Sequence, residues 1–281
     1  MRYCGREFTD TEIDLIICLS TNGINRTAIS RAFCEEVNWR KPDGGLKEMS
    51  CRVALLKMHR EGHIILPPPE RPDNNHLRKP KPTPFTGPGI EIVGNAGEYA
   101  LTIEIADKTT GPLWNEYIDR YHYLGYAPLP GAQIRYFVIS DKQIVALLGF
   151  SAAAWKAAPR DNYIGWDTQK RKENLHLIVN NARFLILPWV RSKNLASRIL
   201  SMAVKRITTD WYERYCYKPV LLETFVEKER FAGACYKAAN WVCAGYTKGR
   251  GKLDIRHEHK LPVKSVWLYP LRKDFKQWLQ N

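Results

Sequence analysis

The chain has 281 residues, of which 44% are hydrophobic and 11% aromatic, enough for the packed cores of about two ordinary domains. Its formal net charge is +14, which favours a polyanionic partner, and DNA is the partner we expect. Seven cysteines without a C-x-x-C pair argue against a disulfide framework and a zinc ribbon. With no secretory leader and no apolar run of bilayer length, we expect a soluble, cytoplasmic protein with no membrane partner.

Residues 1–66 predict a small helical domain of the winged helix-turn-helix type. Thr9 and Glu12 have the spacing of a capping box for a first helix. Asn25 can cap a second helix, and a third is expected from about Leu46 to Glu61, followed by a short strand or wing in HIILPPP. The overall expectation is therefore an α/β (α+β) protein that begins with a winged-helix-like domain.

The third of these helices is the expected DNA reader, because it would enter the major groove. Its apolar Met49, Val53 and Leu56 are expected to face the core of the domain. The alternative is a small helical docking module with a solvated basic face. The candidate nucleic-acid-binding residues on its other faces are Arg52, Lys57 and Arg60.

A proline-rich segment, residues 67–89, predicts a stiff, extended linker, because it contains eight prolines in 23 residues. It separates residues 1–66 from residues 90–281. Residues 1–90 contain 14 basic and 11 acidic side chains, whereas residues 91–281 contain 29 and 18. Most of the positive charge is therefore expected in the larger domain.

Residues 90–281 predict a mixed α/β domain, with an antiparallel meander first and one βαβ crossover later. A hairpin turn is expected at Asp141-Lys142, and a turn or bulge at Asn180-Asn181. In chain order, the expected elements are a strand (101–106), a helix (111–124), two strands (133–140 and 143–150), an extended segment (174–190), a helix from Asn194, a strand (219–226), a helix (231–240) and a strand (265–271).

The stretch LPWVRSKNLASRIL, residues 187–200, lies at the start of the crossover. Ligands of α/β sheets lie beyond the carboxyl ends of the strands, and a helix N-terminus there attracts phosphate. A short basic loop, residues 191–193, would strengthen this attraction. The alternative is a strand that simply runs into a core helix. The candidate cofactor-binding residues are Arg191, Lys193, Asn194, Leu195, Ala196 and Ser197.

Charged residues within apolar motifs are the candidate catalytic groups. Glu223 interrupts VLLETFV, and a carboxylate in a central strand must be paired or used. It could be a general base or, with Asp161 or His122, a ligand of a divalent metal. The alternatives are an ion pair of Glu223 with Arg183 or Arg160, a turn at Arg160-Asp161, and a histidine bonded at a helix end.

The glycine-rich stretch at residues 245–260 is a second candidate surface for nucleic acid. Its backbone can approach a phosphate chain closely, as such a loop requires. The alternative is a solvated hairpin. The candidate residues are Lys248, Arg250 and Lys252.

Two short patterns resemble the GNAT acyltransferases. Arg191, Asn194 and Ala196 have the spacing of the pyrophosphate loop Q/R-x-x-G-x-G/A, with Asn in place of the first glycine. Tyr236 and Asn240 lie in CYKAANW, which is similar to the family's tyrosine followed four and five residues later by Gly-Phe. The resemblance implies acyl-CoA as a cofactor and Tyr236 as general acid. The alternative for Tyr236 is a core aromatic residue hydrogen-bonded at its tip.

Seven motifs of the larger domain share a further resemblance: HYLG (122–125), PRDNYIGW (159–166), NNARFLILPWV (180–190), NLASRIL (194–200), LLETFV (221–226), CYKAANW (235–241) and GYTKGRG (245–251). In these motifs the chain resembles the DruA family of Druantia anti-phage proteins and, more distantly, the GNAT-like DNA-modifying enzyme Mom. This resemblance implies a DNA-modifying or DNA-processing enzyme in phage defence or a mobile element, with other defence proteins or transposases as partners. A metal-dependent DNA-cleaving or strand-processing enzyme and a non-catalytic DNA-recognition subunit remain open.

Overall fold

The computed structural model describes residues 1–21, 24–70, 80, 82–249 and 261–281. The chain divides into two compact units, Met1–His76 and Leu77–Asn281. Within the described ranges, no helix is both long and apolar enough to cross a membrane.

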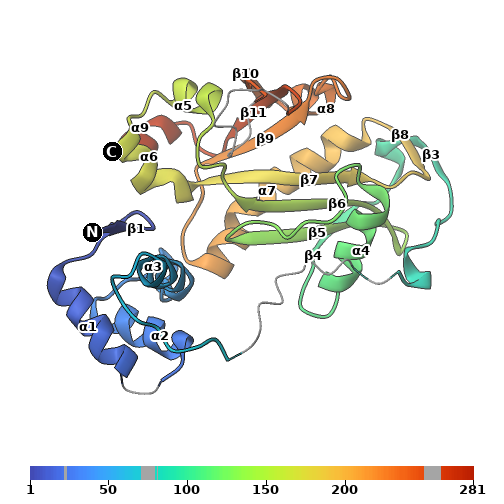
Figure 1. Ribbon diagram of the computed structural model, residues 1–281. Helices are drawn as coiled ribbons and strands as arrows, with labels where there is room; N and C mark the ends of the chain where they lie inside the picture. Colours follow the sequence, from blue (N-terminus) through green and yellow to red (C-terminus); the bar gives the residue numbers. More distant parts are fainter. Residues whose placement is uncertain (22–23, 71–79, 81, 250–260) are drawn as a thin grey trace. The chain divides into compact units, whose positions relative to one another are not determined.

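The described residues of the first unit form three helices, as the sequence predicts (Figure 1). The capping box is present, because the Glu12 N–H donates to Thr9 Oγ1 and the Thr9 N–H donates to the Glu12 carboxylate. Asn25 caps the second helix by accepting from the N–H of Ala28. The elements are β1 (Arg2–Tyr3), β2 (Arg6–Glu7), α1 (Asp10–Thr21), α2 (Arg26–Glu36) and α3 (Glu48–Arg60).

The prediction of which side chains of α3 face the core is wrong. Met49 and Val53 are 59% and 45% exposed, and the buried residues of the helix are Cys51, Ala54, Leu55 and Met58. Both sets have helical spacing, but the small Cys51 and Ala54 let α3 pack closely against α2. An apolar stripe of α3 is therefore left on the surface.

The strand predicted in HIILPPP does not form. Residues 63–69 are irregular, and Ile64 and Leu66 are buried in the core of the first unit. Pro67, Pro68 and Pro69 have no N–H to donate to a partner strand, which explains the difference. The three helices are confirmed, whereas the winged-helix assignment stays a prediction.

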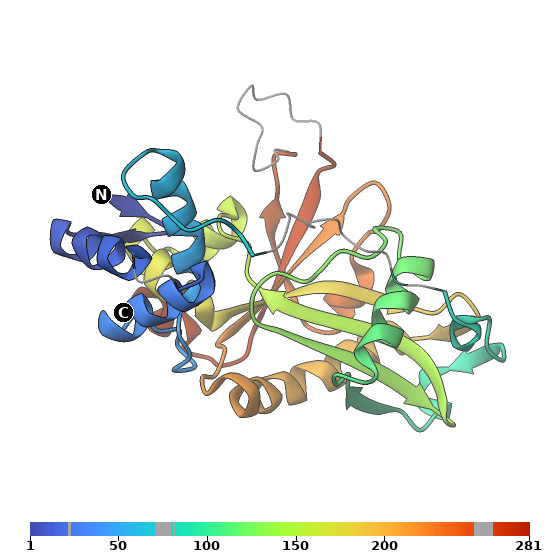
Figure 2. The same cartoon turned by 60° about the horizontal axis from the view of Figure 1, so that its bottom comes forward.

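A seven-stranded mixed sheet with the order β10-β11-β9-β7-β6-β5-β4 forms the second unit (Figure 2). Every pair of neighbours in it is antiparallel except β7 and β9, which are parallel. The mixed α/β fold and its single crossover are therefore confirmed. The strands are β4 (Thr102–Ile105), β5 (Gln133–Ser140), β6 (Gln143–Ala152), β7 (Ile178–Ile186), β9 (Leu221–Glu227), β10 (Val242–Tyr246) and β11 (Lys264–Pro270).

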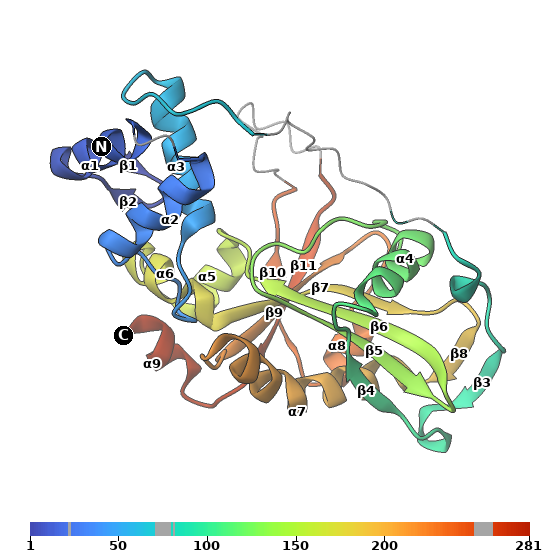
Figure 3. The ribbon, with the colours of Figure 1, turned by 90° about the horizontal axis from the view of Figure 1, so that it is seen from below.

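Helices cover both faces of this sheet (Figure 3). Tyr136 of β5 donates to Asp210 of α7, whereas its neighbour Arg135 donates to Asn115 of α4. Because successive side chains of a strand point to opposite faces, α4 and α7 lie on opposite faces. The α-helices are α4 (Gly111–Tyr121), α5 (Ala158–Ile164), α6 (Thr168–Asn174), α7 (Leu195–Tyr215), α8 (Ala234–Ala238) and α9 (Phe275–Gln280).

The end of the predicted linker belongs to the second unit. Residues Pro84–Thr86 form a short 3₁₀ helix, and Thr83 and Thr86 donate hydrogen bonds to the buried Glu116 of α4. Tyr117 donates to the carbonyl of Phe85. This part of the chain is therefore fixed to α4, and the expected extended form is wrong there.

The crossover strands separate soon after they meet. β7 and β9 pair only between Ile178–Asn180 and Leu221–Glu223. A bulge lies at the same place. Phe150 of β6 pairs with Asn181 and Gly149 pairs with Arg183, so Ala182 is the extra residue of β7. The bulge confirms the irregularity predicted near residues 180–181. The separation of β7 from β9 leaves a cavity between the two strands.

Candidate functional site

A cavity of 490 Å³ lies where β7 and β9 separate. Its lining combines the two strands with the end of α4, the first turn of α7 and the start of α8. The lining includes His122, Tyr123, Asn181, Ala196, Thr224, Phe231 and Tyr236.

Tyr236 lies in this cavity with its hydroxyl fixed. The hydroxyl donates to Asn181 Oδ1 at 2.9 Å, and the backbone carbonyl of Asn181 accepts from Thr224 Oγ1 at 2.9 Å. Burial raises the pKa of Tyr236 well above its ordinary value. The phenol is therefore neutral at physiological pH, and its oxygen holds a proton inside the cavity.

His122 is the second titratable group in the lining. Its Nδ1 accepts from the N–H of Leu124 at 3.2 Å, so the proton of the neutral ring is on Nε2. Burial, and secondly the charge of Arg183, lower the pKa of His122 to about 4. In this tautomer His122 offers a hydrogen-bond donor rather than the lone pair that the general-base prediction requires.

The lowered pKa of His122 predicts a loss of stability in acid. Below pH 6.5 this histidine takes up a proton in the unfolded chain, whereas in the folded protein it stays neutral until about pH 4. The unfolded state therefore binds more protons between these two values, and the free energy of unfolding falls as the pH falls. Between pH 7 and 5, the free energy of unfolding should fall by about 2 kcal/mol more in the wild type than in His122→Gln. Urea unfolding measures this. An unchanged slope in His122→Gln would contradict the prediction.

The first turn of α7 reaches the same cavity through Ala196. Asn194 precedes the helix with φ 63°, a left-handed conformation, and its side chain makes no capping bond. The first N–H groups of an α-helix have no partner within the helix, so those of Leu195, Ala196 and Ser197 are available to an anion. Ser197 itself donates from Oγ to the carbonyl of Asn194.

The basic residues before Asn194 do not form the predicted loop. Val190–Lys193 is a strand, β8, which pairs in parallel with β3 (Ile92–Asn95). Arg191 still has an exposed side chain, with its guanidinium 3.8 Å from Glu91, and Lys193 is exposed. Both charges are therefore free to reorient toward a phosphate near α7.

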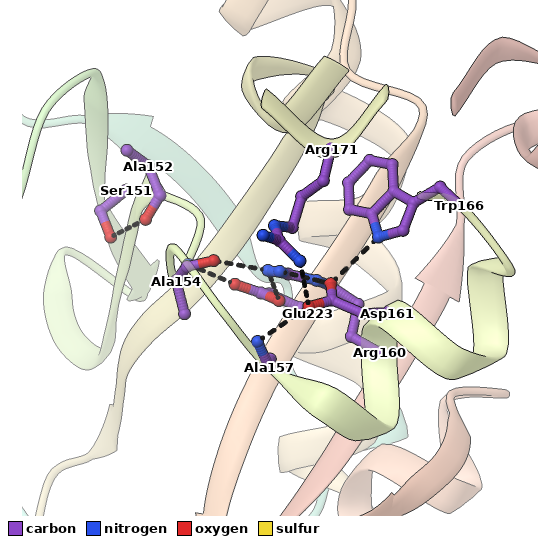
Figure 4. A network of polar contacts seen from close by, with 9 residues as sticks. All are labelled: Ser151, Ala152, Ala154, Ala157, Arg160, Asp161, Trp166, Arg171 and Glu223. Atoms are coloured by element: carbon purple, nitrogen blue, oxygen red, sulfur yellow. Dashed lines mark hydrogen bonds and ion pairs between the residues drawn. The ribbon is translucent and has the colours of Figure 1, made fainter. Parts of the chain in front are cut away.

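Glu223 lies in a buried ion network on the other face of β9 (Figure 4). Its Oε2 is 2.8 Å from Arg160 Nη1, and its Oε1 accepts from the N–H of Ala154 at 2.7 Å. Arg160 also donates to Asp161 Oδ1 at 2.7 Å, and Asp161 is 3.6 Å from Arg171. Burial raises the pKa of Glu223, and the charge of Arg160 opposes that rise.

The structure thus brings Glu223, Arg160 and Asp161 together but keeps them apart from His122 and Tyr236. None of the three lines the cavity, and both carboxylates are bonded to one guanidinium. The described residues contain no group of three or more His, Cys, Asp or Glu side chains that could hold a metal ion. The network has the geometry of the structural ion pair that was the alternative interpretation of Glu223.

The candidate nucleic-acid residues occupy different environments. Arg52 is half-buried and bonds to Thr27 of α2, whereas Lys57 and Arg60 are exposed on α3. Lys248 follows β10. The other two candidates, Arg250 and Lys252, lie outside the described residues.

Several residues of the cavity were missed by the sequence interpretation. Asn181 and Thr224 hold Tyr236, and Tyr123 and Phe231 lie at the edge of the lining. Polarity within β7 was interpreted only as a turn or bulge. The bulge was a usable signal, because bulges often lie next to active sites.

Three solved structures that are similar to part of this chain are acetyltransferases. One is an aminoglycoside acetyltransferase in complex with coenzyme A, with 11% identity, 63% of this chain and 98% of that chain covered, and a TM-score of 0.41. Another, a GNAT-family acetyltransferase from Streptococcus pneumoniae, has 13% identity, coverage of 61% and 99%, and a TM-score of 0.39. A polyamine N-acetyltransferase from Drosophila melanogaster has 10% identity, coverage of 61% and 100%, and a TM-score of 0.40.

No curated protein matches the sequence of the chain. Its residues 68–259, more than half of the chain, match the family of the Druantia protein DruA. The match includes the end of α4, the crossover and α8, and therefore most of the cavity. The chain belongs to the DruA family.

Proposed function

We propose that the protein is a transferase that binds an acyl-CoA-type cofactor between β7 and β9 and modifies DNA. The observation that carries this proposal is the single cavity that joins the first turn of α7 to the buried hydroxyl of Tyr236. A helix N-terminus suits phosphate, and a mostly apolar cavity with a few fixed polar groups suits an organic ligand.

The residues present fit such a cofactor. The N–H groups of Leu195, Ala196 and Ser197 would hold its phosphates, and Arg191 and Lys193 would add positive charge. When bound, the cofactor supplies an activated acyl group. Tyr236 holds a proton in the cavity, and His122 offers its Nε2–H to orient an acceptor.

DNA is proposed as the acceptor because the chain has a net charge of +14. The resemblance to the DruA family implies the same target and a role in phage defence. The decisive experiment is mass spectrometry of DNA incubated with the protein and acetyl-CoA. Modification that requires a divalent metal instead, or strand cleavage, would favour the metal-dependent alternative, and unchanged DNA bound tightly would favour a recognition subunit.

DNA binding should depend steeply on salt. Each phosphate contact should contribute about −0.9 to the slope of log K against log salt on duplex DNA. Lys57→Ala and Arg60→Ala, which remove exposed charges from α3, should each make the slope shallower by about one such contact. Fluorescence anisotropy at several salt concentrations measures this. Affinity that stays constant from low to physiological salt would contradict electrostatic binding.

Two substitutions of Asn194 should separate cofactor binding from stability. Asn194 has φ 63° and makes no capping bond, so Asn194→Gly should not destabilise the protein. Asn194→Asp places a negative charge beside the proposed phosphates and should weaken acetyl-CoA binding by about 1–2 kcal/mol relative to Asn194→Gly. Calorimetry measures binding, and thermal unfolding measures stability. Equal acetyl-CoA affinities of the two variants would exclude phosphate binding at α7.

A further inference from the structure

The mouth of the cavity carries an exposed apolar lip formed by Tyr123, Leu124 and Phe231. Their exposed fractions are 40%, 47% and 49%, and all three line the cavity. The rings of Tyr123 and Phe231 are 5.5 Å apart between centroids. Clustered exposed apolar side chains at the mouth of a cavity usually mark a binding surface.

The lip is joined to a buried ring of the cavity. Tyr123 stacks on His122, with centroids 4.9 Å apart and an angle of 26° between the planes. His122 and Tyr236 are both buried, and both line the same cavity. A planar ligand on the lip would therefore enter a space lined by aromatic faces and a few hydrogen-bonding groups.

Charged side chains surround these rings. The guanidinium of Arg230 lies 5.1 Å from the centroid of Tyr123, and its Nε is 3.1 Å from Glu227 Oε1. Burial and the charge of Glu227 raise the pKa of Tyr123, and the charges of Arg183 and Arg230 oppose that rise. Burial, and secondly the charge of Arg183, lower the pKa of His122. Among the described residues, the buried Nε of Arg183 has no hydrogen-bond partner. Arg183 therefore keeps a donor for an anion beside the rings, and Arg230 could offer its charge in place of its contact with Glu227.

We propose that the lip takes an unpaired nucleobase of a DNA strand, stacked on Tyr123 and Phe231, with its phosphates near Arg230 and Arg183. A nucleobase combines an aromatic face, edge donors and acceptors, and flanking negative charge, which are the properties that this mouth complements. A base inside a duplex is already stacked on both faces, so it must leave the stack to reach the cavity. This inference rests on the proposal that DNA is the acceptor, and it specifies the unpaired base as the substrate class.

The test compares two single strands of equal length, one with bases and one in which every site is abasic, so that only the bases differ. Wild-type protein should bind the strand with bases about 5- to 150-fold more tightly at one salt concentration, because stacking contributes about 1–3 kcal/mol per base. Tyr123→Ala and Phe231→Ala should each reduce this ratio at least several-fold. Neither should change affinity for the abasic strand. Fluorescence anisotropy with the full chain gives all the values.

Two variants control for folding and for general surface effects. Tyr123→Phe keeps the aromatic face and should keep the ratio. Trp155→Ala removes an aromatic side chain that is 57% exposed and does not line the cavity, so it should also keep the ratio. A wild-type ratio near one, or equal ratios in Tyr123→Ala, Phe231→Ala and Trp155→Ala, would overturn the inference.

Acetyl-CoA calorimetry on the same proteins separates this inference from the proposed function. A base-dependent ratio that is lost in Tyr123→Ala, without measurable acetyl-CoA binding, would support the lip and refute the cofactor. Acetyl-CoA binding with a ratio near one would support the cofactor and refute the lip.

Discussion

Replacing Arg160 with methionine is expected to lower the free energy of unfolding by about 3–5 kcal/mol, the usual cost of breaking a buried ion pair. Arg160 and Glu223 are both fully buried, 2.8 Å apart. Without the guanidinium, Glu223 must remain charged in the core or take up a proton, and Asp161 also loses its closest cation. Urea unfolding at pH 7 measures the loss.

The matched control is Arg191→Met, which makes the same change in an exposed ion pair and should alter stability by about 0.5 kcal/mol or less. The double variant Arg160→Met/Glu223→Leu should recover part of the loss, because it removes both charges from the core. If Arg160→Met cost no more than Arg191→Met, the network would not be a structural element, and a role for Glu223 in chemistry would return.

Replacing Tyr236 with phenylalanine is expected to slow DNA modification by about 10²- to 10⁴-fold, the usual contribution of a positioned proton donor. This expectation rests on the proposed function. The change removes only the hydroxyl that donates to Asn181, so stability should fall by only about 1 kcal/mol. Acetyl-CoA affinity should change little. Single-turnover rates from mass spectrometry of the DNA, with calorimetry beside them, measure the difference.

The control for this prediction is Tyr246→Phe, which removes a hydroxyl from an exposed residue of β10 and should leave the rate unchanged. A Tyr236→Phe rate within a few-fold of wild type would show that Tyr236 is only a core aromatic residue. Weaker acetyl-CoA binding with an unchanged rate at saturation would instead indicate a binding role.

Local signals predicted the elements of the second unit well. Both residues of the predicted hairpin turn, Asp141 and Lys142, have positive φ, and Asn194 takes the left-handed conformation expected for a residue that replaces glycine. Such features depend on neighbouring residues in the chain. The position of Glu223 in an apolar strand is also a local signal, because a charge in a central strand is costly unless it has a partner.

Features that depend on distant pairing were not predictable. Residues 190–193 form a strand only because residues 92–95 lie beside them. The sequence does not show whether Arg160 or Arg183 is the partner of Glu223, because only the fold decides which of them lies against β9. The cavity itself results from the short register of β7 with β9, and no composition or period in either strand encodes where the pairing stops.

The early separation of β7 from β9 has a consequence for association with other proteins. Beyond Asn180 in β7 and Glu223 in β9, the two strands no longer pair with each other. Within the described chain, the backbone groups that each strand turns toward the other therefore have no partner strand, as at the edge of a sheet. A sheet edge invites a strand from another molecule, and proteins normally protect such edges at the rim of the sheet. Here the end of α4 and the start of α8 wall in these edges. These backbone groups of both strands therefore lie beside the cavity and not at the rim of the sheet.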